Sequence, residues 1–390
     1  MVAFSVVALL FPVILHFARK HGIVDNPNFR KIHRKPVPVM GGVAVFAGIL
    51  ASSLILLYLH PAPIILWILF SMSFMLMIGI WDDIKGLSIT FRFVIEFTFV
   101  GLFVYNTGIY VDNLHGLWEF QTNEFPVFFF VLSMVSGVGI INSINMIDGV
   151  DGYSSGFCIQ ACICFSLLFG VVGDLLMMEF CLISAAALLP FFMHNVFGEE
   201  SKMFIGDGGT MMLGILMTIF AFLSLSSKSL CQQLEVKQVS LIAITMAILS
   251  VPIFDTLRVM VLRILRGASP FKPDQTHLHH LFIEMGFSHL GVSMSILSIN
   301  FFVILVWLVS WETGASIECQ IWIVILMGFL LTFGLYNWLK MQQLGGKLDS
   351  RGNPTGTFFW LFFLRIGKMS HCENTCLWSR IQHQLDRWYS

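Results

Sequence analysis

The chain has 390 residues, of which 57% are hydrophobic and only 12% are charged, and its mean hydropathy is +0.83. A soluble globular domain carries about twice that charged fraction, so the composition excludes a soluble catalytic domain. The net charge of −1 hides a strong asymmetry between the two sides of the predicted fold. We expect contact with membrane lipid and no nucleic-acid partner.

A membrane-spanning helix needs about 20 mostly apolar residues. Segments of this kind follow one another along most of the chain. They lie near 1–18, 39–59, 64–80, 91–107, 126–144, 153–172, 175–194, 209–226, 238–262, 290–310 and 318–339. We therefore predict an all-α polytopic membrane protein with about 11 transmembrane helices. One catalytic bundle is expected over 1–339, followed by a cytoplasmic tail at 340–390, part of it at the membrane interface.

The distribution of basic residues predicts the orientation. If the N-terminus lies outside, 20 of the 22 lysines and arginines fall in inner loops or the tail, and only Lys228 and Lys237 fall outside. Cytoplasmic loops are rich in these residues, so we expect the N-terminus outside and the C-terminus in the cytoplasm. The first segment is followed by its basic residues, which predicts an uncleaved span. Cys231 and Cys319 fall on the outer side, where a disulfide is allowed, and the sequence leaves their pairing open.

Four polar clusters fall in loops predicted to lie on the inner face. They are WDDIKG (81–86), NMIDGVDG (145–152), FIGDGGT (204–210) and THLHH (276–280). Carboxylates, glycines and histidines gathered at one membrane face indicate a reaction of phosphates at the boundary between water and lipid.

Asp82 and Asp83 end the third predicted span. A helix C-terminus favours cations, and adjacent carboxylates repel each other, so the pair indicates a bound cation or a donated proton. The alternative is an ordinary acidic loop in which Lys85 is the partner.

The second cluster places Asp148 and Asp151 three residues apart, each followed by glycine. Glycine permits positive φ and a close approach of backbone to a ligand. Asn142 and Asn145 share one helical face just before it. The alternative for Asp151 is an N-cap of the next span, which would leave the other residues unexplained.

The third cluster, FIGDGGT, leads into a predicted span. A glycine-rich turn before a helix can point backbone N–H groups at an anion. Asp207 would then hold a metal ion beside that anion. Phe204 could stack on a nucleotide base, or it could be an interfacial aromatic.

The fourth inner loop carries Arg263, His277, His279 and His280. Three histidines suggest zinc, but no acidic or cysteine ligand is adjacent in the motif, and Mg²⁺ prefers oxygen ligands. We interpret these side chains as donors to phosphate oxygens or as residues that shape the pocket.

Three further groups of charges have simpler explanations. The first inner loop is basic and rich in proline, which topology alone explains, although Arg34 and Lys35 are assigned to the site. Arg92 and Glu96, spaced i,i+4, are expected to pair as scaffold. A second pair, spaced i,i+3, has the same expectation: Asp255 and Arg258.

In this order, the four clusters resemble the polyprenyl-phosphate N-acetylhexosamine-1-phosphate transferase superfamily, over roughly residues 19–290. THLHHL is similar to the His-x-His-His signature of its N-acetylglucosaminyl branch. Leu278 interrupts the three consecutive histidines typical of the lipid I translocase. The resemblance implies a multi-pass enzyme of the bacterial inner membrane with its site facing the cytoplasm. It implies transfer of GlcNAc-1-phosphate from UDP-GlcNAc to undecaprenyl phosphate, with release of UMP and dependence on Mg²⁺ or Mn²⁺.

We combine the resemblance with the chemistry of phosphoryl transfer, which depends on positioning and charge neutralisation. Asp207 is then expected to bind the metal with Asp82 or Asp83, one of which orients or deprotonates the lipid phosphate. The remaining site residues are expected to position the substrates: Lys85, Asp148, Asp151, Asn142, Asn145, Phe204 at the uracil, and, at the diphosphate, Arg263, His277, His279 and His280.

Several alternatives stay open at this stage. The donor could be another UDP-N-acetylhexosamine or the phospho-MurNAc-pentapeptide, and spacing does not decide between direct attack and a covalent aspartyl intermediate. A homodimer is neither indicated nor excluded. A membrane transporter is the remote alternative, but transporters keep polar groups near the bilayer midplane, whereas these clusters lie at span ends.

Overall fold

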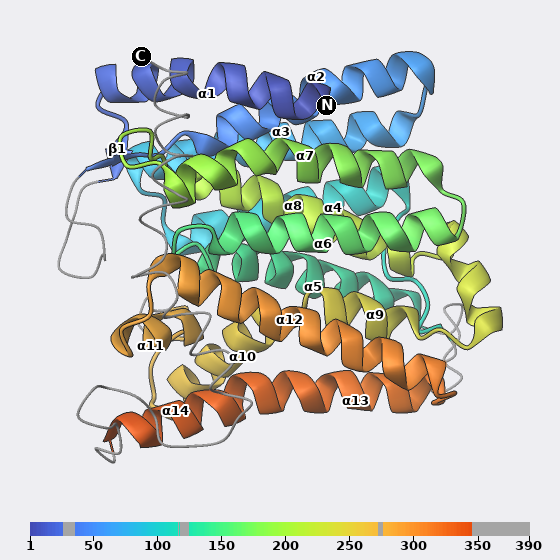
Figure 1. Cartoon of the computed structure of the whole chain (residues 1–390). Helices are drawn as coiled ribbons and strands as arrows, with labels where there is room; N and C mark the ends of the chain where they lie inside the picture. Colours follow the sequence, from blue (N-terminus) through green and yellow to red (C-terminus); the bar gives the residue numbers. More distant parts are fainter. Residues whose placement is uncertain (26–35, 116, 118–124, 272–275, 345–390) are drawn as a thin grey trace.

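The computed structural model describes residues 1–25, 36–115, 117, 125–271 and 276–344, and they are almost entirely helical (Figure 1). The long helices are α1 (Val2–Lys20), α2 (Gly41–Leu59), α3 (Pro63–Lys85), α4 (Ile89–Thr107), α5 (Pro126–Met146), α6 (Tyr153–Val171), α7 (Leu175–Phe197), α8 (Gly206–Leu225) and α12 (His289–Glu312). The other helices are η3 (Leu230–Lys237), α9 (Leu241–Ile248), α10 (Ser250–Leu265), α11 (Leu278–Glu284), α13 (Ile317–Phe329), η4 (Leu330–Gly334) and α14 (Leu335–Leu344). The strands β1 (Val24–Asp25) and β2 (Val37–Pro38) form a short antiparallel pair.

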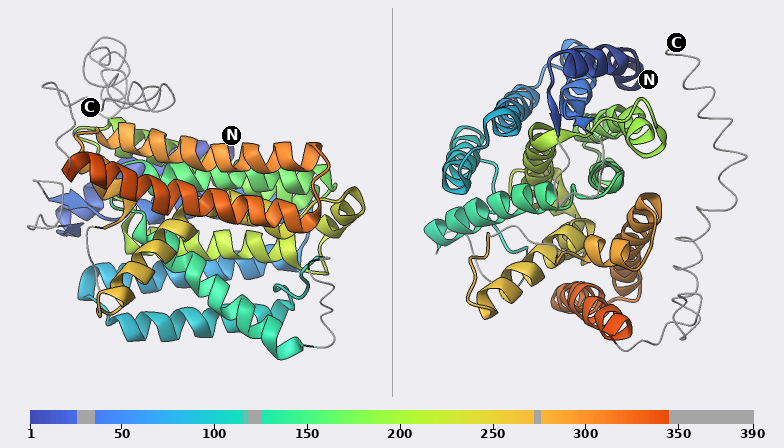
Figure 2. Two further views of the ribbon diagram at one scale, coloured as in Figure 1. Left: turned by 90° about the horizontal axis from the view of Figure 1, so that it is seen from below. Right: turned by 90° about the vertical axis from the view of Figure 1, so that its left-hand side faces the viewer.

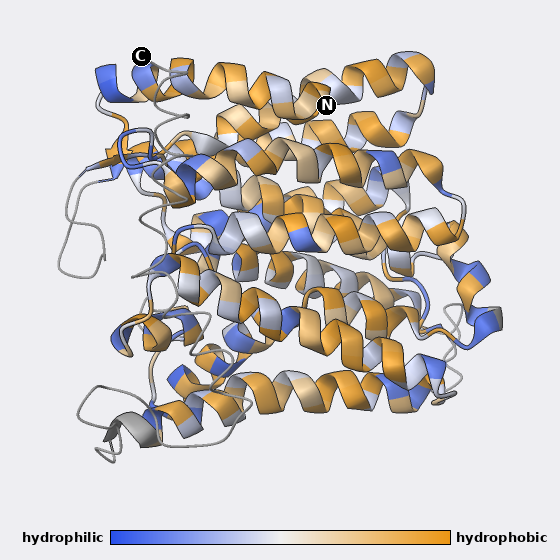
Figure 3. Cartoon of the chain, in the orientation of Figure 1, coloured by the Kyte–Doolittle hydropathy of each residue, from blue (hydrophilic) through white to orange (hydrophobic). Residues whose placement is uncertain are grey.

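The predicted all-α polytopic fold is confirmed. Among the described residues, ten helices are long and apolar enough to cross a membrane, or eleven if the bent pair α9 and α10 counts as one span. The long helices run side by side, with apolar residues along their middle and polar residues gathered at both ends (Figure 3). The predicted last span is continuous from Ile317 to Met341, through a single turn of π-helix at η4.

Helix α8 lies at the centre of the bundle and is buried along almost its whole length. Two glycine pairs allow α3 and α2 to approach it closely. A Cβ atom on Gly79 would lie 2.4 Å from the Cα of Gly208, and one on Gly42 would lie 2.4 Å from the Cα of Gly209. These helices are therefore held in backbone-to-backbone contact, as small residues permit in membrane bundles.

The span predicted near 238–262 is broken in the structure. The segment forms two helices that meet at an angle of 77°, and α10 runs obliquely to the long helices (Figure 2). The bend leaves backbone groups without helical partners, and Asn300 of α12 satisfies them. Its side chain accepts from the Val251 N–H at 3.1 Å and donates to the Ile248 carbonyl at 3.0 Å. A backbone break inside a membrane requires such replacement partners.

Two further expectations concern the outer side and the tail. Cys231 and Cys319 are both free thiols, so the disulfide that the sequence left open is absent from the structure. Helix α14 carries the described chain five residues past the predicted end of the bundle, to Leu344. The expected cytoplasmic and interfacial tail falls mostly in 345–390, outside the described residues.

Candidate active site

Residues from the four predicted clusters meet around one polar cavity of about 380 Å³ at the end of the bundle that carries β1 and α11 (Figure 1). Strand β2 brings the N-terminal segment to this end, because Phe204 donates its N–H to the carbonyl of Pro38 at 2.8 Å. The polar residues that line the cavity are Asp25, Asp83, Asp148, Asp151, Asn195, Lys202, Asp207, His280 and His289. Phe204 also lines it.

The carboxylate of Asp83 binds the backbone N–H groups at the start of α8. Its carboxylate accepts from the backbone N–H of Asp207 at 3.0 Å and from that of Gly208 at 3.3 Å. The predicted anion cradle of the GDGG turn is therefore already filled by a carboxylate of the protein itself. Gly208 and Gly209 serve helix packing, and only Gly206, at φ 77°, is required by the turn. Asp207 itself projects from the first turn of α8 and lines the cavity.

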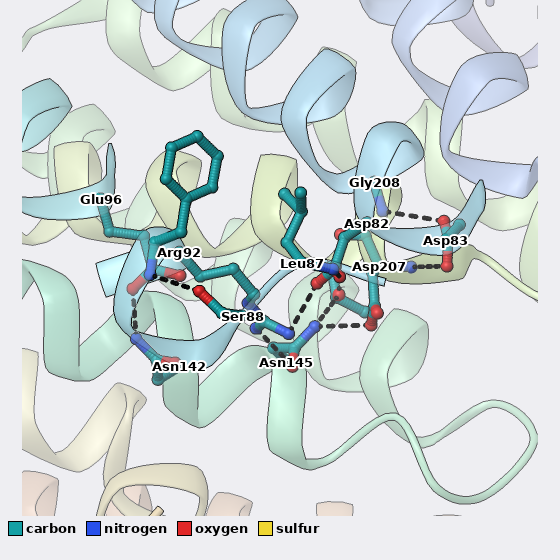
Figure 4. Close-up of polar contacts among 12 residues, drawn as sticks. Asp82, Asp83, Leu87, Ser88, Arg92, Glu96, Asn142, Asn145, Asp207 and Gly208 are labelled. Atoms are coloured by element: carbon teal, nitrogen blue, oxygen red, sulfur yellow. Dashed lines mark hydrogen bonds and ion pairs between the residues drawn. The ribbon is translucent and has the colours of Figure 1, made fainter. Parts of the chain in front are cut away.

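Asp82 points toward α4 rather than toward the cavity. Its Oδ2 accepts from Arg92 Nη1 at 2.9 Å, and its Oδ1 accepts from the Leu87 N–H at 2.6 Å (Figure 4). The expected pairing of Arg92 with Glu96 is wrong, because Glu96 instead accepts from Asn142 Nδ2 at 2.5 Å. The adjacent carboxylates thus have different surroundings, with Asp82 beside a cation and Asp83 at a helix N-terminus.

Asn145 joins these two parts of the site. Its side-chain oxygen accepts from Arg92 Nη2 at 3.1 Å, and its Nδ2 lies 3.0 Å from Asp207 Oδ1 and 2.7 Å from Thr210 Oγ1. One amide therefore links the guanidinium on α4 to the carboxylate on α8 (Figure 4). The prediction that Asn142 and Asn145 share a face holds in sequence spacing, but the two amides have different partners.

The loop between α5 and α6 holds two carboxyl groups with opposite electrostatic character. Burial, reinforced by the nearby Asp207, Asp151 and Asp83, raises the pKa of Asp148 to about 8, against a hydrogen bond from Ser154. Such a carboxyl is largely protonated at neutral pH unless a cation comes close.

Asp151 is contacted by a lysine and a histidine that sequence reasoning missed. Lys202 Nζ lies 2.6 Å and His289 Nδ1 lies 2.7 Å from its Oδ2. Although burial opposes ionisation, the hydrogen bonds and charges of His289 and Lys202 hold the pKa of Asp151 below its usual value. Asp151 is not the N-cap of α6, which was the alternative. Gly152 holds that position, and no side chain caps the start of the helix.

A carboxylate on α10 holds the histidine cluster, which consists of His277, His279 and His280, in place. His277 lies 2.9 Å from Asp255 Oδ2, the same carboxylate that pairs with Arg258 at 2.7 Å. The expected pairing of Asp255 with Arg258 is confirmed. His279 is buried against Tyr153, and burial, with the neighbouring His280 and His277, lowers its pKa well below the usual value. Of the three predicted histidines, only His280 lines the cavity.

Beside the polar cavity lies an apolar one of about 840 Å³. It is bounded by α4, α5, α8 and the bent pair α9 and α10, which meet at 77°. Asn142, Ser143 and Met146 of α5 line its end nearest to Asn145. Asn145 lies beside Met146 of the apolar cavity and contacts Asp207 of the polar one, so the Arg92–Asn145 link lies near both cavities.

Some predicted residues are not brought to the cavity. Arg34 and Lys35 lie outside the described residues. Lys85 is exposed at the end of α3, and Arg263 donates to the carbonyl of Pro270 at 2.6 Å away from the cavity lining. The alternative of an acidic loop with Lys85 as the partner is not realised for Asp82, which pairs with Arg92, and the assignment of Lys85 to substrate binding stays a prediction.

The residues that sequence reasoning missed are Asp25, Asn195, Lys202 and His289. Asn195 ends a span, and Lys202 stands two residues before Phe204, so their position beside a motif was a usable signal. His289 follows the histidine cluster by nine residues and has no such signal, because only the fold of α12 returns it to Asp151.

The sequence is similar to that of known transferases. A family model described as glycosyl transferase family 4 matches residues 65–225. A probable undecaprenyl-phosphate N-acetylglucosaminyl 1-phosphate transferase of Bacillus subtilis is 31% identical over 294 residues, which are 74% of this chain and 77% of that protein. The chain belongs to glycosyl transferase family 4.

Other members of the family agree with this assignment. The undecaprenyl-phosphate alpha-N-acetylglucosaminyl 1-phosphate transferase of Escherichia coli K12 is 30% identical over 70% of this chain and 72% of its own length. The protein of the same name from Salmonella typhi is 28% identical over 82% of this chain and 84% of its own. The family model spans α3 to α8 and thus three of the four polar clusters.

Proposed function

We propose that this protein transfers GlcNAc-1-phosphate from UDP-GlcNAc to undecaprenyl phosphate, giving undecaprenyl-diphospho-GlcNAc and UMP. The observation that carries the proposal is the position of a polar, carboxylate-lined cavity directly beside a larger apolar cavity at one end of the bundle. A reaction between a water-soluble nucleotide sugar and a membrane lipid needs both environments next to each other. The names of the relatives supply the substrate pair.

The apolar cavity suits the lipid acceptor. Its volume of about 840 Å³ and its walls of aliphatic and aromatic side chains, with Phe93, Phe97 and Phe222 among them, favour a hydrocarbon chain. The isoprenoid tail would lie between α4, α5 and α10, with its phosphate at the end marked by Asn142 and Met146. That end faces the carboxylates of the polar cavity across Asn145.

The polar cavity suits the donor and a divalent cation. Asp83, Asp148 and Asp207 line it, and the pKa of Asp148 is raised by burial first and by the neighbouring carboxylates second. Carboxylate oxygens are the ligands that Mg²⁺ and Mn²⁺ prefer. No group of three or more metal-binding side chains is arranged as a complete site among the described residues, which fits Mg²⁺, since it usually takes one or two carboxylates together with substrate phosphates.

Different residues of the polar cavity would bind the cation and the donor. Asp83 and Asp207 would hold the cation, which when bound supplies charge neutralisation to the diphosphate. Lys202 and His289, fixed by Asp151, and His280 would meet phosphate oxygens of the donor. Phe204 offers an aromatic face for the uracil, beside Lys202 Nζ at 5.7 Å from its ring centroid.

The membrane arrangement follows the distribution of basic residues. We place the polar cavity at the cytoplasmic face of a bacterial inner membrane, since the lysines and arginines of the described residues gather toward this end, with Lys228 and Lys237 as the exceptions. UDP-sugars are made in the cytoplasm, so this orientation gives the donor direct access. The product would start a cell-surface polysaccharide.

The test uses the purified full-length protein in detergent with undecaprenyl phosphate, UDP-GlcNAc and Mg²⁺. We expect UMP and a lipid-linked GlcNAc product, loss of both with EDTA, and recovery on adding Mg²⁺. Asp207→Asn should remove turnover while the protein keeps its elution profile. Absence of UMP from folded wild-type protein, with a product from another UDP-N-acetylhexosamine, would reject the GlcNAc assignment. Full turnover in EDTA would reject the cation.

A further inference from the structure

Arg92 occupies the boundary between the two cavities. Thr90 and Phe93, its neighbours on α4, line the apolar cavity, while its guanidinium is tied through Asn145 to Asp207 of the polar cavity (Figure 4). The side chain is 18% exposed, whereas that of its partner Asp82 is 7% exposed. The guanidinium itself lines neither cavity, but it keeps part of its surface exposed between residues of the two.

The contacts of Arg92 leave some of its N–H donors without an acceptor. A guanidinium has five N–H groups in a planar fork, and here Nη1 donates to Asp82 and Nη2 donates to Asn145. Within the part of the chain that the structure describes, no acceptor engages the other three. An arginine needed only to neutralise Asp82 would gain more from a bidentate pair, in which two parallel N–H groups face both carboxylate oxygens. Asp82 instead turns its second oxygen to the Leu87 N–H.

The partners of Arg92 fix the position of its guanidinium without using all of its N–H donors. Asp82 fixes the guanidinium from the side of α3, and Asn145 fixes it from α5. Asn145 is fully used, because its oxygen accepts from Arg92 and its amide nitrogen faces Asp207 and Thr210. A cation held in this way is preorganised, so that little conformational entropy is lost when an anion binds.

On the basis of the function proposed above, we infer that Arg92 binds the phosphate of the lipid acceptor and that Asp82 and Asn145 position it. Two anionic substrates repel each other as the acceptor oxygen approaches the donor phosphorus. A guanidinium on the acceptor side reduces this repulsion, and its planar fork matches two phosphate oxygens. Asp82 is then a positioning residue for Arg92, and the cation of the donor is left to Asp83 and Asp207.

The experiment compares Arg92→Gln, Arg92→Lys and wild type, with undecaprenyl phosphate and UDP-GlcNAc varied separately. We expect Arg92→Gln to lower kcat/KM for the acceptor about 10- to 100-fold, the effect of losing charge-assisted hydrogen bonds. The dissociation constant for UDP-GlcNAc, measured without lipid, should stay within about twofold. Arg92→Lys keeps the charge without the fork and should fall between the two. Arg266→Gln, at an exposed arginine near the end of α10, is the matched control and should resemble wild type.

A shorter acceptor separates recognition of the head group from recognition of the tail. Arg92→Gln should lower kcat/KM by the same factor for farnesyl phosphate and for undecaprenyl phosphate, because only the phosphate touches Arg92. An equal loss of donor and acceptor affinity, or a loss that depends on tail length, would overturn the inference. Inactive wild-type protein would instead reject the proposed function, so the two failures are distinguishable. Asp82→Asn in the Arg92→Gln background should add little, since the two residues act as a unit.

Discussion

Gly79 and Gly208 lie in close contact near the site, and an added methyl group on Gly79 should disrupt catalysis. A Cβ on Gly79 would lie 2.4 Å from the Cα of Gly208 and 2.5 Å from both the Asp207 carbonyl oxygen and the Gly208 nitrogen. All three are backbone atoms, so none can rotate away. Ordinary contact begins at 3.4 Å, so Gly79→Ala requires α3 and α8 to separate by about 1 Å.

That separation acts on the site directly. Asp83, one turn after Gly79, accepts from Asp207 and Gly208 at 3.0 and 3.3 Å, and an extra 1 Å takes both distances beyond hydrogen-bond range. Overpacking and the two lost hydrogen bonds together cost about 2–6 kcal/mol of unfolding free energy. A displacement of 1 Å between the carboxylates should lower kcat about 100-fold.

The assay measures UMP release and thermal unfolding in detergent. Gly101→Ala on α4 is the matched control, because its added Cβ meets only the flexible end of Met134 at 3.3 Å. This control should keep its activity and stability near wild type. If Gly79→Ala behaved like Gly101→Ala, the close contact of α3 and α8 would not hold the carboxylates, and the reasoning would be wrong.

Two further predictions use the cavities. Gly139 lines the apolar cavity and has no atom within 4 Å of an added Cβ; Gly139→Phe should therefore fold and raise the KM for undecaprenyl phosphate at least about tenfold. Gly139→Ala, which should stabilise α5 by about 0.5–1 kcal/mol, tests whether the effect follows size; equal KM values for both variants would contradict the placement of the lipid. For Asp148, a folded-state pKa of about 8 against 3.8 makes the ionised carboxyl a growing penalty as pH rises from about 4 to 8. In metal-free protein, Asp148→Asn should raise the unfolding midpoint at pH 8 and change it little at pH 4, where the folded wild type is already protonated. A midpoint equally raised at both pH values would show that the gain is not electrostatic.

The sequence was sufficient for the helices and for the place of the site. Apolar runs of about 20 residues predicted the spans, because a membrane helix must satisfy its backbone internally and bury apolar side chains in lipid. Clusters at alternate span ends predicted that Asp83, Asp148, Asp151 and Asp207 would come together, and all four line one cavity. The break between α9 and α10 was not predicted, because its replacement partner, Asn300, lies about 50 residues away in the chain.

The sequence did not predict which partner each residue of the clusters has. Asp82 and Asp83 look equivalent when adjacent, but successive helical residues point about 100° apart, and the neighbour on each side decides the role. The i,i+4 spacing of Arg92 and Glu96 predicted a local pair, whereas tertiary packing offered Arg92 a carboxylate on α3 and Glu96 an amide on α5. Sequence spacing describes only contacts within one helix, and these residues contact other helices.

The GDGG motif shows most clearly why a local pattern and its function can separate. Glycines before a helix are typical of a phosphate-binding turn, yet here two of them hold helices in contact and the free N–H groups of the turn face Asp83. A carboxylate at that place keeps a phosphate from binding the helix N-terminus directly. An anionic substrate is therefore left to side chains, and those at hand are Lys202 and His289 beside Asp151, and Arg92, which Asn145 links to Asp207. Because these groups lie in different parts of the site, we expect each of the two phosphate-bearing substrates to meet a group of its own.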